Sequence, residues 1–248
     1  MPVAVITGAN SGIGNAWAAL LVRKVGSFIS ILKALIHIAD CQKSYTVYAL
    51  DVSIGSSITN LGCEYFQVDV TSPGSIAKFR SAFGDRPVDM LLNVAGIMAK
   101  PDQDALKTTT LESLSKLFAV NASGPFLLTQ TLLPNLLAAG NAKIGIVSTR
   151  VSSMTDNTGG SLYAYRASKA AVNAIGVSLS VDLRPHGIMV VLLHPGINST
   201  NLAGGAFAGI EQAFEPADTA ERLFKVMDEK TIGDTGKFFQ YEGLELPW

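Results

Sequence analysis

Cysteine and histidine are scarce in this chain of 248 residues, which contains two cysteines and three histidines. Cys41 and Cys63 have no metal-ligand spacing and are too few for a disulfide framework. His37 and His186 have no partners at the spacing of a catalytic triad or a metal centre. The sequence therefore predicts no metal site, and its cysteine usage favours a reducing, cytoplasmic compartment.

Charged residues are also scarce, at 16% of the chain, and 19 basic against 20 acidic residues leave a net charge of −1. This balance gives no reason to expect nucleic acid or an anionic membrane surface as a partner. The most apolar stretch, Val25–Ala39, is too short to span a bilayer and is interrupted by Lys33 and His37. The N-terminal run Met1–Ile6 lacks the basic residues of a signal peptide. We therefore expect a cytoplasmic protein without a membrane or nucleic-acid partner.

Hydrophobic residues are abundant, at 48%, and they occur in short runs that alternate with helical patterns. Such alternation predicts an α/β fold with a doubly wound parallel sheet, in a single domain over residues 1–248. The predicted strands are Val3–Thr7, Thr46–Leu50, Tyr65–Val68, Met90–Asn93, Ile144–Ser148, Met189–His194 and a weaker Gly236–Gln240. The predicted helices are Gly14–Lys24, Pro73–Phe83, Leu111–Leu137, Tyr163–Leu183 and Pro216–Asp228.

One segment, Val25–Gln42, does not fit this pattern. In a dinucleotide-binding unit an acidic residue ends the second strand about 20 residues after the glycines. Here Asp51 lies 37 positions after Gly14, and removing the 18 residues of Val25–Gln42 would leave 19. The segment is either a longer helix or an extra surface helix, or it is an atypical insertion, for example translated intron sequence.

A glycine-rich run, Thr7–Gly14, follows the first strand and opens a helix. Glycines allow a sharp turn and a close approach of the backbone to a pyrophosphate, which the helix N-terminus then faces. The spacing differs from the general dinucleotide fingerprint, and a tight turn without a ligand is the alternative. The candidate cofactor-binding residues of this run are Gly8, Asn10, Ser11, Gly12, Ile13 and Gly14.

Two aspartates follow predicted strands. Asp51 can accept hydrogen bonds from an adenosine ribose and would repel a 2′-phosphate, and the next residue is Val52 instead of an arginine. We therefore expect NAD(H) in preference to NADP(H). Asp69, beside Val70, is placed to reach the adenine amino group. The alternative for both aspartates is a structural role in a turn or, for Asp69, a helix cap.

Tyr165 and Lys169 lie four residues apart at the start of a long helical pattern, so both side chains project from one face of the helix. A free phenol has a pKa of about 10, and a nearby ammonium group stabilises the phenolate and lowers that pKa. The phenol can then exchange a proton with a substrate oxygen during hydride transfer. Tyr163 has Ala167 at the equivalent position and lacks this assistance. An ordinary surface pair is the alternative.

Taken together, these motifs resemble the short-chain dehydrogenase/reductase family over nearly the whole chain. The matching residues occur in the family's order: Thr7-Gly8-x-x-x-Gly12-x-Gly14, Asp69, Asn93-Val94-Ala95-Gly96, Asn121, Tyr165-x-x-x-Lys169 and Pro195-Gly196. Residues 163–169, 235–238 and 245–248 look like the subgroup that contains the C-factor signalling protein and sniffer-type carbonyl reductases. The resemblance implies a Rossmann-type sheet of about seven strands and hydride transfer between NAD(P)(H) and a carbonyl or alcohol.

The resemblance also implies residue roles. It makes Tyr165 the acid/base, Lys169 a ribose ligand that modulates the phenol pKa, and Asn121 the holder of a water that connects Lys169 to solvent. The alternative for Asn121 is a residue that kinks a core helix, and the alternative for Thr200 is a helix N-cap. The remaining implied contacts are Asn93, Ala95 and Gly96 on the adenosine side, and Pro195, Gly196 and Thr200 at the nicotinamide carboxamide.

Two positions depart from the family pattern. Val94 stands where the family usually has a second asparagine, which weakens a turn contact. The family's catalytic serine follows the fifth strand, and strand register assigns that position to Thr149. Its hydroxyl can still donate to a substrate oxygen, with a stiffer χ1. Ser152 is the rival because its spacing to Tyr165 is closer to the usual one.

The sequence leaves two hypotheses for function. The first is an active oxidoreductase, with the small, apolar, glycine-rich segment 201–214 as a substrate lid over an apolar ligand. The second is a nucleotide-binding regulatory or signalling protein of C-factor type with little or no turnover. The resemblance also implies a homo-oligomer, either a dimer or a tetramer, which forms through the helices that carry Asn121 and Tyr165. His194, at a predicted strand end, is interpreted as structural.

Overall fold

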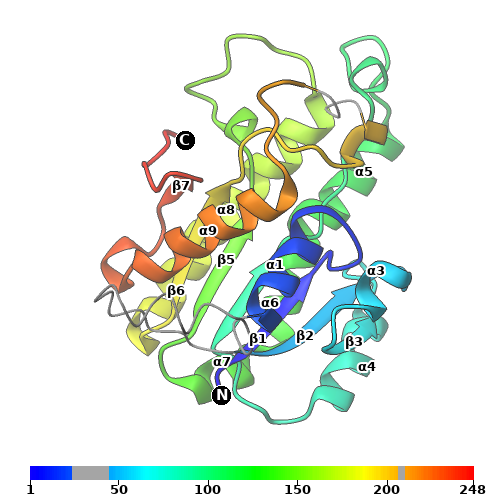
Figure 1. Cartoon of the computed structure of the whole chain (residues 1–248). Helices are drawn as coiled ribbons and strands as arrows, with labels where there is room; N and C mark the ends of the chain where they lie inside the picture. The colour runs from blue at the N-terminus through cyan, green and yellow to red at the C-terminus, as the bar shows by residue number, and fades with distance from the viewer. Residues whose placement is uncertain (24–44, 206–209) are drawn as a thin grey trace, which may run out of the picture.

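The structure is a computed structural model that describes residues 1–23, 45–205 and 210–248 (Figure 1). The predicted insertion Val25–Gln42 lies outside the described residues. Seven strands follow the predicted runs closely. They are β1 (Val3–Thr7), β2 (Thr46–Asp51), β3 (Glu64–Gln67), β4 (Met90–Asn93), β5 (Lys143–Val147), β6 (Met189–His194) and β7 (Phe238–Gln240).

These strands form one parallel sheet in the order β3-β2-β1-β4-β5-β6-β7. The order reverses between β1 and β4, so this is the doubly wound Rossmann-type sheet that the sequence predicts. Strands β1, β4 and β6 are buried along nearly their whole length, which explains why they occur as continuous apolar runs instead of alternating ones, whereas the edge strand β3 is largely exposed. Ligands of such sheets bind beyond the carboxyl ends of the strands, where the order reverses.

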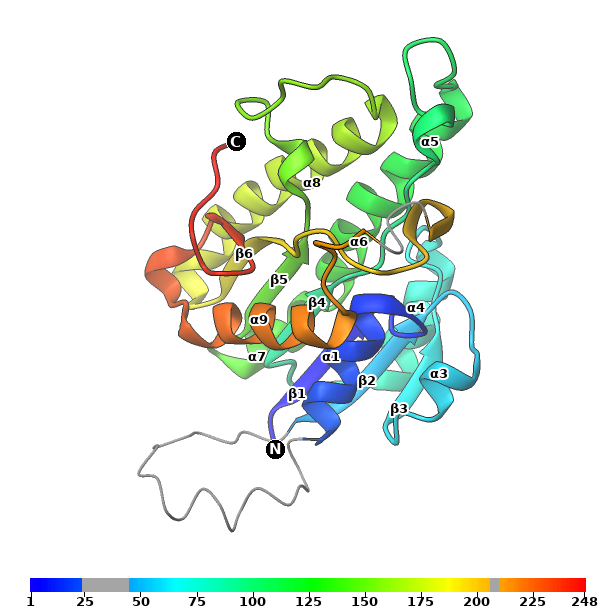
Figure 2. The same ribbon diagram turned by 45° about the horizontal axis from the view of Figure 1, so that its top comes forward.

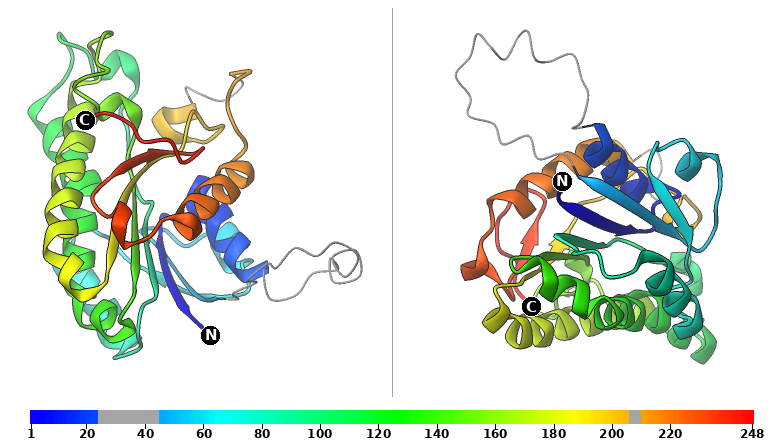
Figure 3. Two further views of the ribbon diagram at one scale, coloured as in Figure 1. Left: turned by 90° about the vertical axis from the view of Figure 1, so that its left-hand side faces the viewer. Right: turned by 90° about the horizontal axis from the view of Figure 1, so that it is seen from below.

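Helices cover both faces of the sheet (Figure 3). On one face α1 (Gly12–Arg23) packs against α9 (Pro216–Glu229), and Trp17 of α1 is fully buried there. The other helices are α3 (Ser56–Thr59), α4 (Pro73–Phe83), α5 (Leu111–Phe118), α6 (Gly124–Thr131), α7 (Leu133–Ala139) and α8 (Tyr163–Leu183). Of these, α4, α6 and α8 contribute to a second apolar cluster, on the opposite face of the sheet. Figure 2 shows the same layers from above.

The segment predicted as a helix, Leu111–Leu137, is helical almost throughout but is not one regular α-helix. The segment divides into α5, a π-helical turn at Ala119–Ser123, α6 and α7. Pro125 lies in the first turn of α6 and Pro134 in the first turn of α7. A proline has no N–H for the helix ladder and its ring meets the carbonyl one turn earlier, so each proline begins a new helical segment. The short helix α3 was not predicted.

Within the described part of the chain, no helix has both the length and the apolar character needed to cross a membrane.

Candidate active site

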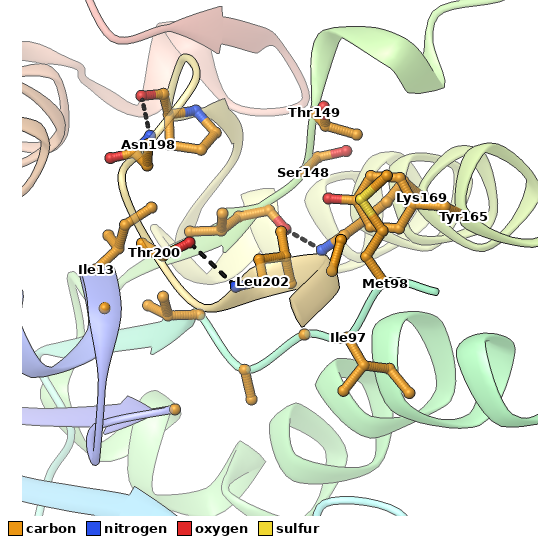
Figure 4. A pocket seen from close by; sticks show the side chains of 18 of the residues that line it. Ile13, Ile97, Met98, Ser148, Thr149, Tyr165, Lys169, Asn198, Thr200 and Leu202 are labelled. Carbon is orange, nitrogen blue, oxygen red and sulfur yellow. Dashed lines mark hydrogen bonds between the residues drawn. The ribbon is translucent and has the colours of Figure 1, made fainter. Parts of the chain in front are cut away.

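A cleft of about 1410 Å³ lies at the carboxyl ends of the strands (Figure 4). Residues from opposite ends of the chain meet there, because parallel strands all end at this edge. Most of the predicted site residues line it: Gly8, Ser11, Gly12, Ile13, Asp51, Asp69, Val70, Ala95, Gly96, Thr149, Tyr165, Lys169, Pro195, Gly196 and Thr200.

Five predicted site residues are not among the lining residues, and each has another place in the fold. Asn10 bonds the Ser53 hydroxyl at 3.2 Å and Gly55 N at 3.1 Å, beside the cleft. Gly14 packs on the turn below the cleft, and Asn93 is buried with its amide nitrogen 3.5 Å from the Thr129 hydroxyl. Asn121 and Ser152 are buried behind the lining residues.

The glycine turn requires glycine at particular positions. Gly8 and Gly12 have φ angles of 70° and 54°, in the left-handed region that other residues rarely adopt. A Cβ on Gly14 would lie 2.2 Å from the carbonyl oxygen of Gly8, so only glycine lets the first turn of α1 pack so closely. The first turn of α1 also contains no acidic residue. Its free N–H groups and positive end therefore suit an anionic ligand in the cleft.

Asp51 already has several hydrogen-bond donors. Its carboxylate accepts from Asn10 N at 2.9 Å, from Ser53 N at 3.0 Å and from the Ser53 hydroxyl at 3.2 Å. These bonds join the glycine turn to the end of β2 while the carboxylate still faces the cleft. Asp69 is similar: its carboxylate accepts from Thr71 N at 2.8 Å and from the Thr71 hydroxyl at 2.7 Å.

Tyr165 and Lys169 converge as the i, i+4 spacing predicts, and both side chains are buried (Figure 4). The Lys169 ammonium donates to the carbonyl oxygen of Val147 at 2.7 Å. The predicted lowering of the Tyr165 pKa is wrong for this structure. Burial raises the pKa of Tyr165 to about 12 and lowers the pKa of Lys169 to about 8. In both cases the cause is desolvation by burial, which disfavours the charged form of the group.

Thr149 lines the cleft, whereas Ser152 is held inside the protein. The Ser152 hydroxyl donates to the Thr149 carbonyl oxygen at 2.6 Å and accepts from the Asn173 amide at 2.8 Å. The Asn173 carbonyl oxygen in turn accepts from the Ser148 hydroxyl at 2.6 Å. The network joins helix α8 to the end of β5 and leaves the Thr149 hydroxyl on the cleft side. Asn173, one turn beyond Lys169, was not predicted as a site residue.

Asn121 is placed by the π-helical turn that interrupts the predicted long helix. Its carboxamide accepts from Ile97 N at 2.8 Å and donates to the Ile97 carbonyl oxygen at 2.9 Å and to the Ser168 hydroxyl at 3.0 Å. A Cβ on Gly96 would lie 3.3 Å from Asn121 Oδ1 and 3.4 Å from Lys169 Nζ. The carboxamide therefore joins the end of β4 to α8 close to the ammonium group.

The end of β6 supplies the opposite wall of the cleft. Gly196 has a φ of 77°, and a Cβ there would lie 2.9 Å from the Phe214 ring. Thr200 lies next to the glycine turn, since its Cγ2 would be 3.3 Å from a Cβ on Gly12. His194, interpreted as structural, also lines the cleft. Burial, with a smaller effect of Arg150, lowers the pKa of His194 to about 4 and keeps the imidazole neutral.

The cleft also has apolar lining residues. Met98, Leu162, Leu202 and Phe214 all line it. Leu202 and Phe214 belong to the predicted lid 201–214, of which residues 206–209 lie outside the described residues. The lid therefore stays a prediction.

One buried carboxylate near Tyr165 was also missed. Asp104 is fully buried, and its side chain accepts from Ala164 N at 2.8 Å and from Tyr165 N at 3.0 Å. The sequence did contain a signal for such a residue: Leu162, which precedes Tyr163, has no side-chain oxygen that could cap the helix, so the cap had to come from elsewhere.

Comparison with known proteins identifies the family. The family model described as short chain dehydrogenase matches residues 2–210. C-signal of Myxococcus xanthus is 38% identical over 163 residues, which cover 65% of this chain and 93% of that protein. The 1-hydroxy-2-glutathionyl-2-methyl-3-butene dehydrogenase of Rhodococcus sp. (strain AD45) is 36% identical over 183 residues, covering 73% and 78%.

Solved structures agree with this match. An NADPH-bound carbonyl reductase from chicken fatty liver superimposes with a TM-score of 0.78 at 25% identity, over 100% of both chains. The carbonyl reductase Sniffer of D. melanogaster gives 0.79 at 25% identity, again over 100% of both chains. The chain belongs to the short-chain dehydrogenase family and is an oxidoreductase that depends on a nicotinamide dinucleotide.

Proposed function

We propose that the chain transfers a hydride between a bound nicotinamide dinucleotide and a small carbonyl compound or alcohol, with Tyr165 as the acid/base. The observation that carries the proposal is that one cleft of about 1410 Å³ is lined by the glycine turn, the Tyr165–Lys169 pair and Thr149. Fold alone does not imply an activity, but this combination of residues is the one that carbonyl chemistry needs.

The residues of the cleft fit a dinucleotide. The left-handed Gly8 and Gly12 and the free N–H groups of α1 form a cradle for a pyrophosphate, and Asp51 faces the cleft where a ribose would bind. In this proposal the remaining contacts are Asp69 and Val70 to adenine, Asn93, Ala95 and Gly96 on the adenosine side, Lys169 to the nicotinamide ribose, and Pro195, Gly196 and Thr200 to the carboxamide.

Proton transfer is assigned to Tyr165 Oη. With its pKa raised to about 12, the phenol is protonated at neutral pH and can donate a proton to a carbonyl oxygen that is being reduced. The Thr149 hydroxyl can donate a second hydrogen bond to the same oxygen and stabilise the charge that develops there. Asn121 retains its proposed role of holding a water beside Lys169.

Asp51 supports NAD(H) as the preferred cofactor. Its carboxylate would repel the 2′-phosphate of NADP(H). The basic residues that line the described part of the cleft are Lys116, Arg150, Arg166 and Lys169, and none of them belongs to the segments next to Asp51. The chicken carbonyl reductase was solved with NADPH, so a direct comparison of the two dinucleotides is the necessary test.

A carbonyl compound with an apolar body is the proposed substrate class. Two solved relatives are named as carbonyl reductases, and Met98, Leu162 and Phe214 contribute apolar side chains to the lining of the cleft. Apolar walls with a few convergent polar groups are typical of small-molecule sites.

A homo-oligomer is also proposed. Leu114 and Phe118 on α5, Phe126 on α6, and Val177 and Val181 on α8 are between 36% and 66% exposed. Exposed apolar side chains on helices of this kind support a subunit interface. A sedimentation mass of a dimer or tetramer at micromolar concentration is expected, and a monomer mass would contradict it.

The test begins with fluorescence titrations of NADH and NADPH, followed by a panel of carbonyl substrates with each dinucleotide. Tyr165→Phe should lower kcat by a factor of about 100 to 10,000 while the dinucleotide still binds, because only the proton donor is lost. Tyr163→Phe is the matched control: this tyrosine is 43% exposed and the variant should keep wild-type kcat.

Absence of pyridine-nucleotide binding, or wild-type turnover by Tyr165→Phe, would refute the proposed function. The regulatory alternative is not favoured, because Thr149, Tyr165 and Lys169 all meet at the cleft. It predicts a biological effect that survives Tyr165→Phe.

A further inference from the structure

The helix that carries Tyr165 has no cap of its own. Leu162, the residue before the first turn of α8, makes no side-chain capping bond. The first N–H groups of a helix need acceptors, and leaving them unsatisfied inside a protein is unfavourable. Here the acceptor is the carboxylate of Asp104, which comes from the loop between β4 and α5 and lies about 60 positions earlier in the chain.

Both carboxylate oxygens of Asp104 accept hydrogen bonds. Oδ1 accepts from Ala164 N at 2.8 Å and from the Thr109 hydroxyl at 3.0 Å, and Oδ2 accepts from Tyr165 N at 3.0 Å. Its backbone carbonyl oxygen accepts from Leu162 N at 2.8 Å. A carboxylate without exposed surface is stable only with such charge-assisted bonds, which are stronger than neutral ones, and the positive end of α8 adds to them.

The chain just before α8 is strained, and Asp104 helps to hold it. Gly160, Ser161 and Leu162 have φ angles of 60°, 56° and 54°, so two residues with side chains are left-handed in succession. Such conformations persist only where the surroundings enforce them, and they concentrate at functional sites. Besides Asp104, Arg166 holds this turn, by donating to the carbonyl oxygens of Gly160 at 3.1 Å and Ser161 at 3.0 Å.

The hydrogen bonds of Asp104 to the start of α8, here called the anchor, also join two walls of the cleft. Ile97 and Met98, which lie in the loop that ends in Asp104, pack in one apolar cluster with Leu162 and Tyr165. The loop is therefore connected to the first turn of α8 both by this apolar cluster and by the hydrogen bonds of Asp104. A shift of about 1 Å in the position of a reacting group can lower a rate a hundredfold, so the rigidity of this junction matters for catalysis.

We infer that Asp104 is a positioning residue that fixes the first turn of α8, and with it Tyr165, against the loop that forms the Met98 wall of the substrate cleft. The inference rests on the proposed role of Tyr165. Asp104 is fully buried and does not line the cleft, so it acts on the reaction through the residues that it holds.

Three variants and a control test the inference. Asp104→Asn keeps the size and one acceptor but loses the charge, Asp104→Ala loses both, and Thr109→Val removes one donor without altering the bonds to α8. Asp102→Asn is the matched control, since Asp102 lies in the same loop and is exposed. For each we would measure the dinucleotide Kd, kcat and KM for one carbonyl substrate, and the thermal midpoint.

For Asp104→Asn we expect kcat to fall by about tenfold to a hundredfold in protein that is folded and binds the dinucleotide within about twofold of wild type. Asp104→Ala should fall further, and Thr109→Val and Asp102→Asn should stay within about threefold of wild type. Unchanged kcat in Asp104→Asn would overturn the inference. The inference would also be overturned if kcat fell only in proportion to the fraction of protein that no longer folds and binds the dinucleotide.

Hydrogen exchange separates this inference from the proposed function. The amides of Ala164 and Tyr165 should exchange at least about tenfold faster in Asp104→Asn than in wild type, and Asp102→Asn should not change them. This readout needs no turnover. If the wild type bound no dinucleotide or reduced no substrate, the proposed function would fail while the anchor could still be measured. Unchanged exchange in Asp104→Asn overturns the anchor even in an active enzyme.

Discussion

The Lys169 ammonium donates to the backbone carbonyl oxygen of Val147 at 2.7 Å, so the lysine is held on the strand end that precedes Thr149. Lys169 is buried, and burial alone lowers its pKa to about 8. The charge is thus kept at a cost in folding stability, which is common for functional groups. This relation gives a prediction for stability as well as for activity.

Lys169→Met should stabilise the fold at pH 7 by about 1 to 3 kcal/mol and abolish turnover, because an apolar chain of similar length replaces a buried ammonium. The folded pKa of about 8 lies below the usual 10.5, so the unfolded chain binds more protons between these pH values. Wild-type stability should therefore rise with pH in that window. The gain from Lys169→Met should be largest below pH 8 and shrink toward pH 10.5. Urea unfolding of both proteins at several pH values measures this. A gain independent of pH would contradict it.

Thr149 and Ser152 should respond differently to substitution. Thr149→Ala should lower kcat by about a hundredfold, because a hydrogen-bond donor to the substrate oxygen is lost, whereas Thr149→Ser should retain activity. Ser152→Ala should act mainly on stability, with a loss of about 1 to 3 kcal/mol, since the buried Asn173 amide loses its acceptor. Steady-state kinetics and urea unfolding separate the two effects. A larger kcat loss in Ser152→Ala than in Thr149→Ala would reverse the assignment.

Asp51 should control the choice between dinucleotides. Asp51→Ser removes the charge that opposes a 2′-phosphate and should shift the ratio of NADH to NADPH affinity toward NADPH by about a hundredfold. Part of the shift should disappear at high ionic strength because salt screens the charge. Fluorescence titration measures both affinities. Asp69→Asn, at the adenine end, is the control and should leave the ratio unchanged. Tighter binding of NADPH by the wild type would disprove the proposed preference.

Gly14→Ala should destabilise the fold by about 3 kcal/mol or prevent folding, because overpacking in a rigid core is costly and the new Cβ would lie 2.2 Å from the Gly8 carbonyl oxygen. Gly159→Ala is the control, since nothing lies within 4 Å of a Cβ there. Thermal unfolding measures both, and a Gly14→Ala protein with the wild-type midpoint would contradict the packing seen here.

The fold and much of the site followed from local patterns. Continuous apolar runs predicted the seven strands, and the spacing of Tyr165 and Lys169 placed both on one face of α8. These predictions succeed because strand burial and helical periodicity are properties of short segments. The interruption of the helix after Phe118 was missed, although Pro125 gave a local signal for it.

What the sequence determined by itself is therefore the inventory of groups: a glycine turn, a phenol one helical turn from an ammonium, and hydroxyls after the fifth strand. Tertiary structure decided which of these groups are buried, which face the cleft and how their pKa values shift. Burial raised the Tyr165 pKa, although the sequence predicted a lowering, and the Asn173 network turned Ser152 inward and left Thr149 on the cleft. Asp104 reached the start of α8 from a distant loop. Solvent exclusion and contacts between distant segments are properties of the folded chain, so no local pattern encodes them.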